Sequence, residues 1–91
     1  SLVSIVMDEL DELRDAHRDL YRLIDQIHFD DDGYVTVSVM GLGYVLRVSP
    51  RRLAGDLGRY VEFVTRFGPS LDSVAVVDLR FESMIITRRD G

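Results

Sequence analysis

The stretch that decides the fold is the C-terminal run Val74-Ala75-Val76-Val77-Asp78-Leu79-Arg80-Phe81-Glu82-Ser83-Met84-Ile85-Ile86-Thr87-Arg88-Arg89. Apolar and charged side chains alternate in its first half, so Val77, Leu79 and Phe81 share one face of a strand. The apolar residues resume at Met84 with the opposite parity. A bulge or a tight bend near Ser83 restores the alternation. We therefore predict that the chain ends in an antiparallel strand pair.

A hairpin and a helix are predicted directly upstream. Residues 34–48 alternate as two strands around the turn Gly41-Leu42-Gly43. A helix is predicted over residues 50–67, because Ser49 suits the N-cap, proline suits the first helical position, and Gly68-Pro69 ends the pattern. The glycines within this helix, Gly55 and Gly58, lower its intrinsic stability and indicate a close approach to the sheet.

The N-terminal segment has the clearest helical period. Its apolar stripe has a 3-4-3-4 spacing with one polar member, and comprises Val3, Val6, Leu10, Leu13, His17, Leu20, Ile24 and Ile27. Two interpretations stay open, namely packing on the domain's own sheet or a self-associating coil of more than three heptads. Residues 29–33 are predicted to end this helix and to turn the chain, with Gly33 free to adopt positive φ.

Composition narrows the class of protein. The 91 residues form a single small domain or a fragment of one, too small for a large enclosed active site. A net charge of −5 argues against nucleic acid as a partner. The absence of cysteine excludes disulfides and thiolate metal sites. No run of 18 or more apolar residues is present, so the segment itself carries no membrane-spanning stretch.

No enzyme motif occurs in the sequence. A nucleophile elbow, a zinc-binding His-Glu-x-x-His and a phosphate-binding loop are all missing. A calcium loop that began at His28 would place Val39 where a bidentate glutamate is required. We therefore assign no catalytic residue, no cofactor and no metal site, and we predict that the chain is not an enzyme.

The order of these elements, and the string Asp78-Leu79-Arg80-Phe81 above all, resemble the membrane-distal part of the β domain of the bacterial cell-division proteins FtsQ and DivIB. The resemblance covers residues 20–89. It implies a divisome scaffold on the periplasmic or extracytoplasmic side of the inner membrane, with a membrane anchor and a POTRA domain ahead of this segment in the full-length protein. It also implies protein partners of the FtsB and FtsL kind.

We accordingly expect an α+β fold with a long amphipathic N-terminal helix, an antiparallel hairpin, a second helix and C-terminal antiparallel strands. An unpaired terminal strand would bind a partner by strand addition. The residues expected to bind the partner are Arg80, Phe81, Ser83, Met84, Ile86 and Arg88. Homodimerisation of the segment, by strand pairing or through the first helix, is a further expectation. The alternative function is a small regulatory or ligand-sensing domain that dimerises through the N-terminal helix.

Overall fold

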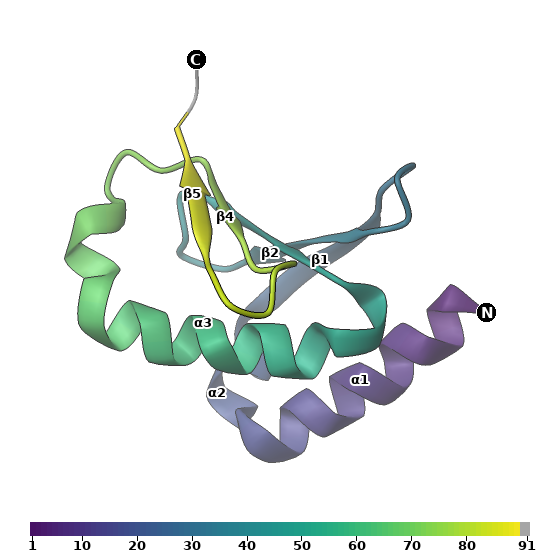
Figure 1. The fold of residues 1–91 in the computed structure, drawn as a ribbon. Coiled ribbons are helices and arrows are strands. Elements are labelled where there is room, and N and C mark those ends of the chain that lie inside the picture. Colours follow the sequence, from purple (N-terminus) through teal and green to yellow (C-terminus); the bar gives the residue numbers. More distant parts are fainter. Residues whose placement is uncertain (90–91) are drawn as a thin grey trace.

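A five-stranded mixed sheet and two long helices make up the fold, which is α+β as predicted (Figure 1). The structure is a computed structural model and describes residues 1–89. The helices are α1 (Leu2–Ala16), α2 (Arg18–Leu23) and α3 (Leu53–Phe67), with short 3-10 turns at Pro50–Arg52 and Gly68–Leu71. The strands are β1 (Ile24–Phe29), β2 (Val35–Val39), β3 (Val45–Val48), β4 (Val76–Asp78) and β5 (Ile86–Arg88).

The strands lie in the order β1-β2-β3-β4-β5, so β5 is an edge strand. Neighbouring strands are antiparallel except β3 and β4, which run parallel because the chain crosses over through α3. In Figure 1, α3 lies below the sheet and α1 packs alongside α3. The arrangement leaves the other face of the sheet and the β5 edge without a covering element within residues 1–89.

The core lies between the sheet and the helices. The alternation over residues 34–48 places Val35, Val37 and Val39 on one face, and all three are buried, as are Val77 and Leu79 of the C-terminal run. Helices contribute Val6, Leu13, Leu53, Leu57 and Tyr60. The period-two pattern therefore predicted the buried face of the hairpin correctly, because one face of a small sheet must be covered.

The prediction of one continuous N-terminal helix is wrong. The helix ends at Ala16, and His17 has a non-helical backbone with φ −142° and ψ 68°. After the short α2, Ile24 and Ile27 belong to β1. The apolar stripe is therefore divided between a helix and a strand, and a coil of more than three heptads is not formed. Residues 29–33 accordingly end a strand, not a helix, although Gly33 has the expected positive φ of 85°.

A bulge explains why the strand β1 has a helical spacing of apolar residues. Residues three apart in a regular strand point to opposite faces. The register of β1 against β2 shifts between Ile24 and Gln26, because Ile24 lies opposite Val39 while Gln26 lies opposite Ser38. This extra residue brings Ile24 and Ile27 to the same face, where both pack against the core. A 3-residue apolar interval therefore fits a bulged strand as well as a helix.

The start of α3 also differs from its prediction. Ser49 and Pro50 begin a 3-10 turn, and the Ser49 side chain caps no amide. The amide of Ala54 instead donates to Oε1 of Glu9 at 3.1 Å, so that α1 supplies the cap. The close approach at Gly58 is to His17, whose Nε2 would lie 3.3 Å from an added Cβ, and not to the sheet. Gly55 has no close neighbour.

The C-terminal run bends where its parity breaks. The strand β4 ends at Asp78, residues 81–83 turn, and β5 returns antiparallel beside β4. The tight bend near Ser83 and the terminal strand pair are therefore confirmed. Phe81 was expected on the face of Val77 and Leu79, but it belongs to the turn and is 41% exposed. The alternation ends at Leu79 because the chain leaves the sheet there.

Candidate functional site

The free edge at β5 and the loop before it, residues 79–85, form the candidate site. Three of the predicted partner-binding residues expose large apolar side chains here: Phe81 is 41%, Met84 is 53% and Ile86 is 38% exposed. The other β5 side chains, Thr87 and Arg88, are exposed as well. An edge strand with exposed apolar side chains is the feature that strand addition requires.

The backbone of Thr87 faces away from the sheet. The Arg88 carbonyl accepts from the Ala75 amide at 2.8 Å, so Arg88 points its backbone groups toward β4. Backbone groups of successive strand residues point to opposite sides, so those of Thr87 point outward and those of Ile86 point to β4. The register agrees, since Ile86 lies opposite Asp78 and Arg88 lies opposite Val76. Thr87 therefore offers the N–H and C=O that an added strand would bind.

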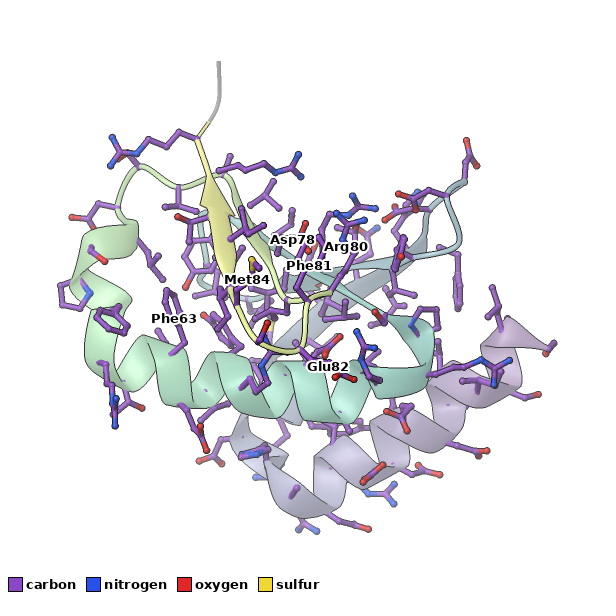
Figure 2. All side chains as sticks on the ribbon, in the orientation of Figure 1. Phe63, Asp78, Arg80, Phe81, Glu82 and Met84 are labelled. Carbon is purple, nitrogen blue, oxygen red and sulfur yellow. The ribbon has the colours of Figure 1, made fainter. Side chains whose placement is uncertain are left out.

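The string Asp78-Leu79-Arg80 has a structural explanation. Leu79 enters the core, while Asp78 and Arg80 point to the opposite, uncovered face. The Arg80 guanidinium donates to both carboxylate oxygens of Asp78, with Nε to Oδ1 at 2.8 Å and Nη2 to Oδ2 at 2.7 Å. The Arg80 amide also donates to Asp78 Oδ1, at 3.2 Å. Figure 2 shows the two side chains together at the end of β4. Asp78 thereby fixes the point where the chain leaves the strand.

Aromatic rings lie beside the Arg80 guanidinium. Its central carbon is 4.6 Å from the Tyr34 ring centroid and 5.5 Å from that of Phe81. Arg80 is therefore already paired by Asp78 and stacked on two rings, whereas Arg88 is exposed on β5. Of the two arginines that are expected to bind the partner, Arg88 has the accessible position.

Further ion pairs extend this cluster along the uncovered face of the sheet. Arg47 donates to Asp32 Oδ2 at 2.7 Å and to Asp30 Oδ2 at 3.1 Å. The hydrogen bond from Arg47 lowers the pKa of Asp32. Burial alone would raise the pKa of Asp78, but the hydrogen bonds from Arg80 outweigh it and hold this pKa below its usual value.

Two arginines of the α3 region hold the loop from its other side. Arg59 donates to the carbonyls of Leu79 at 3.3 Å, Phe81 at 2.7 Å and Met84 at 3.0 Å. Arg52 donates to the carbonyl of Arg80 at 2.5 Å. We call Arg52 and Arg59 the arginine pair. Four carbonyls of the loop thus accept hydrogen bonds from side chains that are distant in sequence.

The buried carboxylate of Asp56 lies between the two members of the arginine pair. Its Oδ1 is 3.8 Å from Arg52 Nε and 3.5 Å from Arg59 Nη1, and its Oδ2 accepts from the Ser49 amide at 2.9 Å. Burial raises the pKa of Asp56, while the Ser49 hydrogen bond and the two arginine charges oppose the rise. Asp56 therefore restricts the positions that both guanidinium groups can take.

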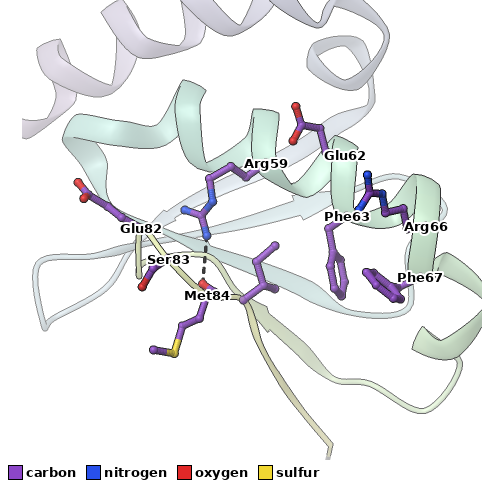
Figure 3. A pocket seen from close by; sticks show the side chains of 9 residues that line it. Arg59, Glu62, Phe63, Arg66, Phe67, Glu82, Ser83 and Met84 are labelled. Atoms are coloured by element: carbon purple, nitrogen blue, oxygen red, sulfur yellow. Dashed lines mark hydrogen bonds between the residues drawn. The ribbon is translucent and has the colours of Figure 1, made fainter.

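An open groove of about 680 Å³ runs between α3 and the loop (Figure 3). Phe63 and Phe67 lie side by side on its helix wall, with ring centroids 5.2 Å apart. Met84 and Ile85 form the opposite wall, and Arg59 spans the groove to the Met84 carbonyl. The groove is open to solvent and its lining mixes apolar and charged side chains, which does not resemble an enclosed ligand pocket.

The predicted partner-binding residues lie on the edge strand and in the neighbouring loop, but they do not include the side chains that hold the loop. Ile86 and Arg88 lie together on β5, while Phe81, Ser83 and Met84 lie in the loop. The arginine pair is not among the predicted partner-binding residues. One signal was available: Arg52, Asp56 and Arg59 recur at intervals of four and three, which places them on one side of a helix.

The lowered pKa of Asp78 predicts an acid-sensitive fold. Because the folded-state pKa lies below the unfolded value of about 3.9, the stabilisation is present above that pH and is lost as the pH falls through the folded-state pKa. We expect the free energy of unfolding, measured with urea at pH 7, 4, 3 and 2, to depend less on pH below about 4 in Asp78→Asn than in the wild type. The pKa of Asp56 is shifted in the opposite direction, upward. Because Asp56 is present in both proteins, its contribution to the pH dependence cancels in this comparison. If the free energy of unfolding fell with pH by the same amount in both proteins, the prediction would be wrong.

Within residues 1–89, no three potential metal-ligating side chains gather at one place, and no helix has both the length and the apolar character needed to cross a bilayer. The chain matches no family model and no curated protein.

Proposed function

We propose that this chain is a non-enzymatic protein-interaction domain that binds an extended partner segment by adding a strand to β5. The observation that carries the proposal is the free edge of the sheet at β5, with the backbone groups of Thr87 directed outward. Edge strands that remain uncovered pair readily with another chain. Main-chain hydrogen bonds then supply affinity, and neighbouring side chains supply selectivity.

The side chains around the edge indicate the chemistry of the partner. Ile86, Met84 and Phe81 present apolar surface beside the strand, and Arg88 adds a positive charge. A segment with alternating apolar side chains and an acidic residue opposite Arg88 complements this surface. Ser83, exposed at the turn, borders the same surface.

The proposed context is the bacterial divisome, on the extracytoplasmic side of the inner membrane. The support for it is the resemblance to FtsQ and DivIB, whose sharpest string, Asp78-Leu79-Arg80-Phe81, forms the end of β4 and the start of the loop. FtsB-like and FtsL-like proteins are then the proposed partners. The membrane anchor that the resemblance implies would lie outside the segment described here.

Replacing the outward-facing Thr87 tests the proposal. Thr87→Pro removes the N–H that an added strand would use, while edge positions tolerate proline within the fold. We expect the affinity for peptides from the FtsB and FtsL homologues of the same genome to fall about tenfold or more, or about 1.4 kcal/mol, by calorimetry. Thr87→Ala is the matched control, because it removes the side chain and keeps the amide, and it should bind as the wild type does.

Ile86→Pro separates the binding edge from the internal strand pair. The Ile86 backbone faces β4, so this proline disrupts the β4–β5 pairing and should lower the free energy of unfolding more than Thr87→Pro does. Equal peptide affinity for wild type and Thr87→Pro would show that β5 does not accept a strand. No binding by the wild type would remove these two partners from the proposal.

A further inference from the structure

We propose that Arg59 is a positioning residue, which holds the 79–85 loop and the β5 edge in the conformation that accepts a partner strand. The inference rests on the proposed function and adds to it a second group of residues, outside the edge itself. Arg59 lies on α3, more than twenty positions before the strand that it would position. Arg59 is not one of the predicted partner-binding residues.

The hydrogen-bond geometry supports this role. A single guanidinium donates to the carbonyls of Leu79, Phe81 and Met84, which span the loop from its first residue to the one before Ile85. Within the described loop, the only backbone hydrogen bond between two of its own residues joins the Met84 amide to the Phe81 carbonyl, at 3.5 Å. The path of the loop therefore depends on the guanidinium rather than on its own turn hydrogen bonds.

The surroundings of Arg59 keep the guanidinium in place. Asp56, buried on the preceding turn of α3, pairs with Nη1 at 3.5 Å, and is itself fixed by the Ser49 amide. Arg52 adds the hydrogen bond to the Arg80 carbonyl between two of the Arg59 contacts. A planar guanidinium suits this task because its donors diverge in a fixed geometry, which the single ammonium of lysine lacks.

The consequence for binding is preorganisation. Strand addition is favoured when the receiving strand is already extended, since ordering it on binding costs affinity. The strand β5 has only three residues, Ile86–Arg88, and within residues 1–89 its only neighbour in the sheet is β4. Such a short strand keeps its place only if the loop that leads into it is held. Arg59 thus links the helix layer to the partner-binding edge.

Amide exchange together with peptide binding tests the inference on the folded protein. In Arg59→Met, the amide protection of Ile86 and Arg88 should fall about tenfold or more, while that of Val37 in the interior strand β2 should stay at the wild-type value. Affinity for the FtsB-homologue or FtsL-homologue peptide should fall about tenfold in parallel. Arg59→Lys, which keeps the charge and loses the divergent donors, should give intermediate values and provides the same comparison if Arg59→Met does not fold.

Arg51→Met is the matched control, since the Arg51 side chain is exposed in the same region and forms no side-chain hydrogen bond with another residue of the range 1–89. It should leave exchange and binding unchanged. Unaltered protection of Ile86 in the Arg59 variants would overturn the inference, and so would an equal loss at Ile86 and Val37, because that result means general destabilisation. If the wild type binds neither peptide, these two partners are removed from the proposed function, while the exchange measurements still decide whether Arg59 positions the edge.

Discussion

Asp78→Ala should lower the free energy of unfolding by about 3 kcal/mol, because it removes the buried carboxylate of an ion pair and leaves the partly buried Arg80 guanidinium without its main partner. Asp78 is 3% exposed and accepts three hydrogen bonds from Arg80. Its loss leaves the Arg80 guanidinium with Asp32, 4.0 Å away, as the remaining carboxylate. A domain of this size has only about 5–15 kcal/mol of stability in total, so the variant should be close to unfolding at room temperature. Urea unfolding followed by circular dichroism measures the change.

A double-mutant cycle identifies the cause of this loss. The double variant Asp78→Ala/Arg80→Ala should lose less unfolding free energy than the sum of the losses in the two single variants. The reason is that Arg80→Ala removes the positive charge that Asp78→Ala leaves without its partner. Asp72→Ala provides the control, because Asp72 is an exposed carboxylate after the 3-10 turn, and it should change stability by no more than about 0.5 kcal/mol. If Asp78→Ala cost no more than Asp72→Ala, the ion pair would contribute nothing to folding.

Leu13→Ala should lower the free energy of unfolding by about 2–5 kcal/mol, as expected for a cavity in a packed core. Leu13 is fully buried at 0% exposure and belongs to the same core as the sheet residues. Because that packing is within one chain, the unfolding midpoint of both proteins should be independent of protein concentration. Urea unfolding at several concentrations between low and high micromolar measures both quantities.

This experiment also tests whether α1 pairs with a second copy of the chain. If α1 paired with a second copy, stability would rise with protein concentration, and Leu13→Ala would weaken that dependence. Met7→Ala is the control on the same helix, because Met7 is 56% exposed, and it should cost about 0.5 kcal/mol or less. A concentration-dependent midpoint would return the dimerising regulatory domain to consideration.

Local rules were sufficient for the middle of the chain. The hairpin is where alternation placed it, with Gly33 and Gly41 both at φ 85°, and α3 ends at the glycine and proline that follow Phe67. The bend near Ser83 was also predictable, because a break of strand parity needs a local correction. In each case the cause lies within a few residues of its effect, so the sequence alone determines the outcome.

In β1, at the sheet edge and in the loop before β5, the outcome depends on tertiary contacts. The apolar residues Ile24 and Ile27 fit a helix by spacing, and only pairing with β2 through a bulge assigns them to a strand. The position of β5 at the sheet edge follows from the parallel β3–β4 pair, which the crossover through α3 creates. The role of Arg59 arises from contacts with residues that are 20 to 25 positions away in the sequence. The sequence determined the local elements and the α+β class, whereas the partners of each strand and loop depended on long-range burial and hydrogen bonding, which no local pattern encodes.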